Sequence, residues 1–302
     1  MCIMKAPIVD NKIPLLFSSN YDYGNFGDLL SRYIVEKISK KEIIKYEYDA
    51  ISSHFCAIGS ILSRNEICSQ SWIWGSGFIS PQKSYKIKLT AIRQFFRRKY
   101  GKATFLAVRG KKTREILLDA GLSCPEIYGD PALLMPSLYT PKKAMARYRV
   151  GIICHTVHEE LPSFFKNDMD GVLKIAINRK YDKITDFVDE VCSCDVILSS
   201  SLHGLIIANA YDIPAVRFVV NGHSLHPNKY GEERQNFKYE DYLSGLNALS
   251  CDENSLEYTF PCIELYPNQH ITKELIEEVY SIASKPSFKW SAQKLLEAFP
   301  YN

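Results

Sequence analysis

The stretch VILSSSLHGLIIANAYDIPAVRF, residues 196–218, decides the fold that we predict for this chain. The apolar run at residues 196–198 is typical of a buried strand, three serines follow as possible helix N-caps, and a helical pattern starts at residues 203–204. A second apolar run, at residues 215–220, comes directly after Pro214. The pattern predicts a βαβ unit with His203 at the carboxyl edge of a parallel sheet, where helix N-termini favour anionic ligands.

His203 has two interpretations at this position. Histidine is a frequent general acid or base near neutral pH, and the carboxyl edge of a parallel sheet is where α/β proteins bind their ligands. A histidine next to a helix start can also be a capping residue without chemistry. Motifs elsewhere in the chain decide between the two.

Short apolar runs alternate with helical patterns along the chain, which is typical of parallel α/β folds. In the first half we predict strands at residues 15–18, 57–58, 72–74, 104–108 and 127–128, and helices at residues 29–38 and 112–120. Prolines at positions 131, 136 and 141 interrupt the pattern, which restarts at residue 149. We therefore expect an α/β fold with two Rossmann-like lobes and a cleft between them. The first lobe comprises residues 1–140, and the second comprises residues 141–302, with His203 and a C-terminal helix.

Composition places the chain among folded globular proteins. Its 302 residues are 46% hydrophobic and carry a net charge of only +3, so the overall charge does not require a nucleic-acid partner, and we expect none. The nine cysteines lack the spacing of a disulfide framework, which favours a reducing, cytoplasmic compartment. We find no signal-peptide pattern and no apolar stretch long enough to cross a bilayer.

Basic residues are concentrated between residues 83 and 114. Twelve lysine and arginine residues occur in this stretch, with no acidic residue among them. Such a stretch can face a phosphate-rich ligand or an anionic membrane, or it can be a solvated surface with acidic residues opposite. The terminal segment at residues 288–299 contains aromatic, leucine and lysine residues, so it is a second candidate for peripheral contact with the inner face of a membrane. Alternatively, this segment docks on the core of the protein.

Several polar motifs stand where such a fold needs ligand-binding loops. Asn25 and Asp28 precede the first predicted helix, and Asp28 can be its N-cap. Arg109 directly follows a predicted strand, and a guanidinium there suits bidentate capture of a carboxylate or phosphate. Asp130 follows the next strand and can accept hydrogen bonds from sugar hydroxyls or brace its loop.

A loop of small residues, Gly75, Ser76 and Gly77, follows the strand at residues 72–74. It lets a ligand approach the backbone closely. Without a third glycine it is a weak dinucleotide signal, and the chain has no phosphate-binding P-loop. We therefore expect no nucleotide cofactor.

Other histidines are candidate catalytic residues or metal ligands. His155 ends the apolar run that starts at residue 149, so it is a candidate general base. Two sets have spacing that suits metal ligation, but neither has a convincing third ligand, so we expect no metal site. They are His155 with His158 and Glu159, and His223 with His226.

Taken in order, these motifs resemble the polysaccharide pyruvyl transferases across residues 15–245. The motifs that carry the resemblance are Asn25-Phe26-Gly27-Asp28, Trp74-Gly75-Ser76-Gly77, Ala107-Val108-Arg109-Gly110, Gly129-Asp130-Pro131-Ala132 and Ser201-Leu202-His203-Gly204, followed by Asp212-Ile213-Pro214. The resemblance implies a fold similar to the GT-B glycosyltransferases. It also implies transfer of a pyruvyl group from the co-substrate phosphoenolpyruvate to two hydroxyls of a sugar, which forms a ketal and releases phosphate. The sugar would belong to the precursor of a surface polysaccharide, such as a capsule or an exopolysaccharide.

The resemblance also assigns roles to individual residues. It makes His203 the general acid/base and Arg109 a ligand of phosphoenolpyruvate. The sugar acceptor would lie on the side of the first lobe, with His155 as the candidate base for its hydroxyl. Residues around His203 would contribute backbone groups to the donor site; they are Ser200, Ser201, Leu202 and Gly204. Ser201 stands where many members carry an arginine, so we expect Arg217 or Lys238 to supply the missing positive charge.

Two other functions fit the residues less well. A GT-B-type glycosyltransferase using a nucleotide sugar would share the fold and a histidine in the cleft, but an obvious ribose-binding carboxylate motif is absent from the second lobe. A non-enzymatic binding module for anionic glycans or membranes would use the basic stretch. Consumption of phosphoenolpyruvate in the presence of a sugar or lipid-linked oligosaccharide acceptor separates the three functions.

Overall fold

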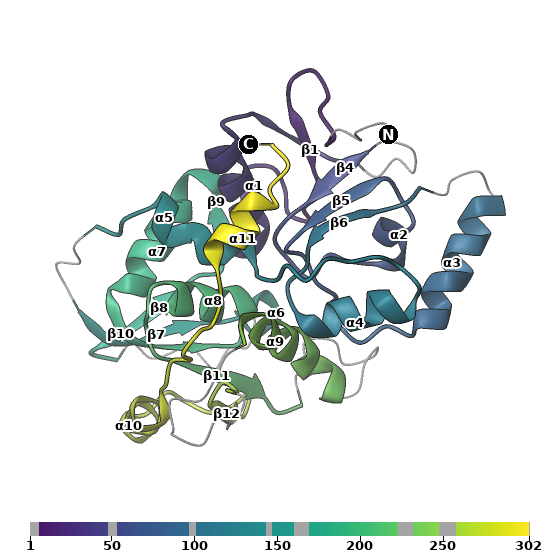
Figure 1. The fold of residues 1–302 in the computed structure, drawn as a ribbon. Coiled ribbons are helices and arrows are strands. Elements are labelled where there is room, and N and C mark those ends of the chain that lie inside the picture. Colours follow the sequence, from purple (N-terminus) through teal and green to yellow (C-terminus); the bar gives the residue numbers. More distant parts are fainter. Residues whose placement is uncertain are drawn as a thin grey trace.

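Two parallel sheets of five strands each form the framework of the protein (Figure 1). The structure is a computed structural model that describes residues 6–47, 53–96, 101–142, 147–159, 169–222, 232–247 and 258–301, with side chains of the helix starting at residue 232 described from residue 236. The predicted α/β class and the two Rossmann-like lobes are confirmed.

The first lobe contains the sheet β3-β1-β4-β5-β6. Its strands are β1 (Ile13–Leu15), β3 (Ile43–Lys45), β4 (His54–Cys56), β5 (Ser71–Trp74) and β6 (Thr104–Ala107). Its helices are α1 (Phe26–Ser39), α2 (Arg64–Ile67), α3 (Ser84–Phe96), α4 (Lys111–Asp119), η1 (Pro131–Leu134) and α5 (Met135–Leu138). The strand predicted at residues 57–58 is wrong, since β4 ends at Cys56, and the one at residues 127–128 is reduced to a single bridge between Val108 and Tyr128.

The second lobe contains the sheet β12-β11-β10-β7-β8. Its strands are β7 (Tyr148–Ile153), β8 (Val172–Ile175), β10 (Cys194–Ser199), β11 (Ala215–Val220) and β12 (Cys262–Leu265). Its other elements are α6 (Thr156–Glu159), η2 (Tyr181–Lys183), α7 (Ile184–Cys192), α8 (Leu202–Ala210), α9 (Glu232–Leu246), α10 (Lys273–Ile282) and α11 (Ala292–Glu297).

The opening stretch forms the predicted βαβ unit, β10-α8-β11, at the centre of the second sheet. Parallel pairing sets Ser199 of β10 beside Arg217 of β11, so both lie near the same sheet edge. Ser201 is the N-cap residue by position, but its side chain makes no capping bond. Instead, the Ser199 hydroxyl accepts a hydrogen bond from the Ser201 N–H and donates one to the Ser201 carbonyl, which fixes the turn before α8.

The two lobes contact each other directly. A short antiparallel pair joins β2 (Tyr23–Asn25) of the first half to β9 (Asn178–Lys180) of the second. The rings of Phe26 and Phe187 stack with centroids 3.8 Å apart, and one buried hydrophobic cluster extends across both lobes. Burial of apolar surface on this scale fixes α1 against the second lobe and therefore against α8.

The terminal segment crosses back to the first lobe, where α11, the yellow helix in Figure 1, contacts η1. The Trp74 indole donates a hydrogen bond of 2.8 Å to the Leu295 carbonyl, and the ring of Phe55 packs against Phe299 and Tyr301. Leu295 and Phe299 are thus core residues, and membrane contact through them is excluded in this fold. The division at residue 140 separates the two sheets, while α11 belongs to the first lobe by contact.

Candidate functional site

His203 faces Asp130 across the boundary between the lobes. His203 lies in the first turn of α8, and its Nε2 is 3.7 Å from Oδ2 of Asp130. Asp130 is fully buried at the N-cap of η1, where its Oδ1 accepts a hydrogen bond from the Ala132 N–H. Within the described residues, neither Nε2 nor Oδ2 has a hydrogen-bond partner. A buried carboxylate this close to an imidazole can orient the ring.

Gly27 admits the His203 ring to this position. A Cβ atom on Gly27 would lie 2.2 Å from Nδ1 of His203, which no side chain can tolerate. The Asn25 side chain accepts a hydrogen bond from the Gly27 N–H, so Asn25 is the N-cap of α1, and the prediction of Asp28 as the cap is wrong. Asp28 instead accepts a hydrogen bond from Ser19. The motif at residues 25–28 therefore shapes the wall against which His203 rests.

A cluster of cations lies next to this edge in the second lobe. The Arg217 guanidinium sits 4.0 Å from the centre of the Tyr239 ring, and the Lys238 ammonium lies 5.1 Å from the same centre. Both cations are over 90% buried, and the structure shows no ion pair for either within the part of the chain it describes. Nε of Arg217 is buried without a hydrogen bond there. Buried unpaired cations are costly, so the arrangement favours an anion.

Burial and the nearby Arg109 and Arg217 guanidinium groups lower the pKa of Lys238 to about 7. An anion bound between Lys238 and Arg217 would oppose this shift, because an opposite charge favours the ammonium form. The sequence-based expectation that these two residues supply positive charge near Ser201 agrees with where they lie, and their role in donor binding stays a prediction.

Ser200 connects the cation cluster to the turn before His203. Its carbonyl accepts a hydrogen bond from the Tyr239 hydroxyl, and its own hydroxyl is 2.8 Å from Nδ1 of His158. The same hydroxyl accepts a hydrogen bond from the His155 N–H. The imidazole in contact with the serine turn is thus that of His158, which sequence reasoning considered only as a metal ligand. No sequence signal separates His158 from His155, because the difference lies in the turn that follows β7.

Of the two sets whose spacing suits metal ligation, the structure describes only His155, His158 and Glu159. The Glu159 carboxylate accepts hydrogen bonds from the Ile177 N–H and the Asn178 amide, so it joins α6 to β9. No group of three potential ligands occurs within the residues that the structure describes. His223 and His226 lie outside those residues.

Arg109 follows β6 as predicted, but its side chain contacts other residues of the protein. Its side chain is fully buried, and its Nε and Nη2 lie 3.0 and 2.9 Å from Oδ2 of Asp241 on α9. It also donates to Ser60 and to the Phe78 carbonyl. With these partners the guanidinium is committed to joining the first lobe to α9, and direct capture of a donor molecule does not follow from this geometry.

The small-residue loop after β5 is also occupied by the protein itself. Gly75 has a φ of +88°, and a Cβ there would lie 2.3 Å from Cδ of Pro131. Ser76 is fully buried and donates to the Ala57 carbonyl, and Gly77 packs against Arg109. The loop supports the Asp130-Pro131 turn, so its effect on the candidate site is indirect.

The remaining predicted residues belong to the start of α8. Leu202 is buried in the shared core, Ser201 is buried in the turn, and Gly204 lies against the Ser199 hydroxyl. Tyr239 and His158 are the contacts that sequence reasoning missed.

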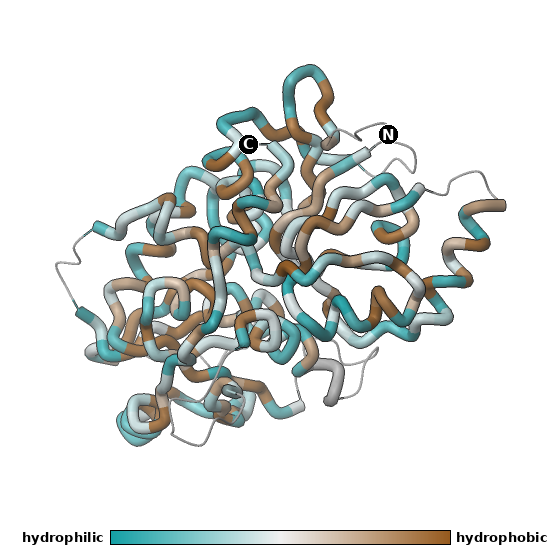
Figure 2. Tube along the Cα trace, viewed as in Figure 1, coloured by the Kyte–Doolittle hydropathy of each residue, from teal (hydrophilic) through white to brown (hydrophobic). Residues whose placement is uncertain are grey.

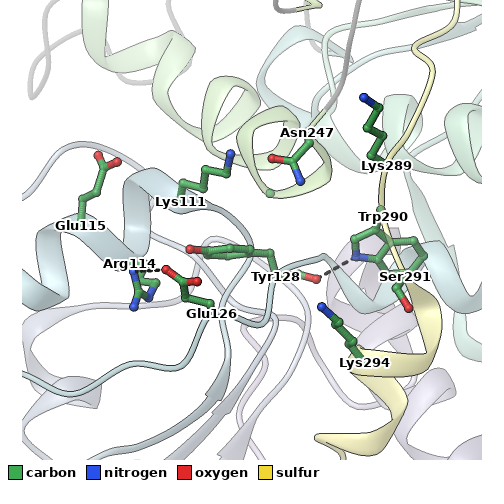
Figure 3. Close-up of a pocket in the computed structure, with 11 residues that line it drawn as sticks. Lys111, Arg114, Glu115, Glu126, Tyr128, Asn247, Lys289, Trp290, Ser291 and Lys294 are labelled. Atoms are coloured by element: carbon green, nitrogen blue, oxygen red, sulfur yellow. Dashed lines mark hydrogen bonds and ion pairs between the residues drawn. The ribbon is translucent and has the colours of Figure 1, made fainter.

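A separate pocket of about 510 Å³ opens beside α4 and the terminal segment (Figure 3). Tyr128 and Trp290 line it together with Lys111, Lys289 and Lys294. None of the residues predicted for the donor, acceptor or catalytic site lines this pocket, although Lys111 and Arg114 belong to the basic stretch. Gly129 links Tyr128, on its wall, to Asp130, which faces His203.

Comparison with known proteins supports the assignment suggested by the motifs. The chain is 25% identical over 281 residues to "Uncharacterized protein L143" of Acanthamoeba polyphaga mimivirus, covering 88% of this chain and 91% of the relative. No solved structure matches significantly. The sequence profile named polysaccharide pyruvyl transferase matches residues 8–223, which include β10, α8 and β11. This chain therefore belongs to the polysaccharide pyruvyl transferase family.

Proposed function

We propose that the protein transfers the pyruvyl group of phosphoenolpyruvate to two hydroxyls of one sugar, forming a cyclic ketal and releasing inorganic phosphate. The observation that supports this most is the placement of His203 with Asp130 beside the Arg217–Lys238 cations, at the two sides of one turn. One group of residues suits proton transfer, and the other suits a donor that carries both a phosphate and a carboxylate.

In this reaction His203 protonates the methylene carbon of phosphoenolpyruvate. One acceptor hydroxyl attacks C2 and gives its proton to His155. The second hydroxyl attacks the same carbon as the C–O bond to phosphate breaks, and its proton leaves with the phosphate. We assign Asp130 the role of a positioning residue, because its buried carboxylate faces the His203 ring across the lobe boundary.

Arg217 and Lys238 hold the donor. In this chain Ser201 replaces the arginine that the family motif often carries, so the positive charge comes from the next strand and from α9. Tyr239 contacts both cations, and its hydroxyl connects them through the Ser200 carbonyl to the turn before His203. His155 is the candidate base for the acceptor hydroxyl, since it follows β7 at the same sheet edge.

Donor binding can be tested without knowing the acceptor. We expect phosphoenolpyruvate to bind the purified protein in isothermal titration calorimetry. Arg217→Met and Lys238→Met should each weaken binding by about tenfold or more, the effect of losing one charge-assisted contact. Lys111→Met is the matched control, because Lys111 is an exposed lysine of the separate pocket. Equal loss with all three variants would contradict the assignment.

Turnover is tested with an acceptor panel that includes nucleotide-linked and lipid-linked sugars. We expect phosphate release from phosphoenolpyruvate only when the right acceptor is present, with a ketal signal in the product NMR spectrum. Consumption of a nucleotide sugar without phosphoenolpyruvate would instead indicate a glycosyltransferase. Glycan binding that survives His203→Ala, with no turnover by the unmodified protein, would indicate a binding module.

A lipid-linked acceptor would require the protein to work at a membrane surface, on the cytoplasmic side in this proposal. None of the helices in the described ranges is long and apolar enough to cross a bilayer. Contact of this kind would therefore be peripheral, through surface residues.

A further inference from the structure

Helix α3 projects at the edge of the first lobe, away from the second (Figure 1). It has 13 residues, which corresponds to a length of about 20 Å at 1.5 Å per residue. Its inner face packs on the lobe through Ile87, the only buried residue of the helix, with Ala91 partly buried beside it. Most of the helix surface is therefore not used by the fold.

The outer face of α3 is apolar and exposed. Tyr85, Leu89, Ile92 and Phe96 follow at intervals of four, three and four residues, so they form one stripe along the helix, opposite Ile87. Their exposed fractions are 52%, 46%, 52% and 79%, and the adjacent Phe95 is 67% exposed. Figure 2 shows hydrophobic segments on this helix at the edge of the molecule. Such a contiguous set of large apolar side chains usually marks an interaction surface.

Cations flank this apolar stripe on both sides. With 100° per residue, Lys86 and Arg93 lie on one side of the stripe and Lys88 on the other. All three are exposed, and the structure shows no ion pair for them within the described ranges. Further along the basic stretch the situation differs, because Lys112 pairs with Glu240 and Arg114 with Glu126. The solvated-face interpretation thus fits the α4 end of the stretch and not α3.

We propose that the outer face of α3 binds the surface of a bilayer that contains anionic lipids. In this arrangement α3 lies in the plane of the membrane, the four stripe side chains enter the boundary between headgroups and acyl chains, and the flanking cations contact lipid phosphates. The charge pattern selects this occupant. Face-to-face contact with a second copy would bring two sets of like charges together, which is unfavourable.

Vesicle flotation measures this binding directly. We expect the protein to float with vesicles of phosphatidylcholine that contain about 30% phosphatidylglycerol, an anionic lipid. It should bind far less to vesicles of pure phosphatidylcholine. Replacing Lys86 and Arg93 by glutamine should lower the partition coefficient about fivefold per residue, the equivalent of about 1 kcal/mol for each cation. Ile92→Ser with Phe96→Ser should lower it on the order of tenfold or more.

The control is Leu118→Ser, an exposed leucine of α4 with a similar exposed fraction of 41%. It should float like the unmodified protein. All of these positions are exposed, so the circular dichroism spectrum should be unchanged in every variant. Phosphoenolpyruvate binding should also be unchanged, so this test is independent of the proposed function. The inference fails if binding does not depend on anionic lipid, or if the α3 variants float normally. It also fails if light scattering shows a dimer that Ile92→Ser with Phe96→Ser dissociates.

Discussion

Replacing Arg109 by methionine should destabilise the fold and leave the donor site largely intact. The guanidinium is fully buried, lies 2.9 and 3.0 Å from the Asp241 carboxylate, and donates to Ser60 and the Phe78 carbonyl. Without it, Asp241 keeps only neutral donors, the N–H and hydroxyl of Thr113, both at 2.8 Å. Removing one partner of a buried ion pair typically costs about 3–5 kcal/mol, and we expect a loss of that size.

Urea unfolding followed by tryptophan fluorescence gives the change in the free energy of unfolding. Asp241→Asn should cost a similar amount, because it leaves the buried guanidinium unpaired. The double variant should lose less than the sum of the single variants, with a coupling of about 1–3 kcal/mol. An alternative result would refute this reasoning: unchanged stability for Arg109→Met together with a raised KM for phosphoenolpyruvate would make Arg109 a donor ligand, as the sequence alone predicts.

Three further predictions concern the candidate site. His203→Ala should lower kcat for phosphate release by about 10²–10⁴-fold, which is the usual contribution of a general acid. Asp130→Asn should lower kcat less, with little change in KM. If these variants changed KM alone, both residues would be binding residues. Gly27→Ala should lower kcat on the order of 10²-fold by displacing the His203 ring, whereas Gly121→Ala, which has open space around it but a φ of +81°, should cost stability and leave kcat unchanged. Because the pKa of Lys238 is lowered to about 7, its ammonium is lost as pH rises through 7. The dissociation constant for sulfate, whose charge is constant in this range, should therefore rise above pH 7, and Lys238→Met should flatten that rise.

Local pattern was sufficient to predict the βαβ unit. The strand, the serine turn and the apolar helix are consecutive in sequence, so periodicity alone places His203 at the sheet edge. Prediction of α1 was less exact, because Asn25 and Asp28 are both good capping residues and only the backbone shows that Asn25 is the cap. Element types are thus easier to infer than their ends.

The partners of charged residues could not be inferred in the same way. Arg109 and Asp241 are 132 residues apart, and nothing near Arg109 in the sequence indicates that a helix from the other half buries it. A strand-end arginine has the same local pattern whether it binds a ligand or an internal carboxylate. The pairing of His203 with Asp130 has the same origin, since their contact depends on how the lobes meet.

The contacts of the terminal segment also set an order of events during synthesis. Strands β1, β4 and β5 leave the ribosome early, but their contacts with the terminal segment form late. The buried Trp74 indole donates to the Leu295 carbonyl, and the Tyr301 hydroxyl donates to the Pro7 carbonyl. Until residues 292–301 have been translated, the first lobe exposes aromatic surface that the finished fold covers. The residues of the second sheet are made after those of the first, yet the second sheet can assemble before the core of the first lobe is covered. An isolated fragment of residues 1–140 should therefore aggregate.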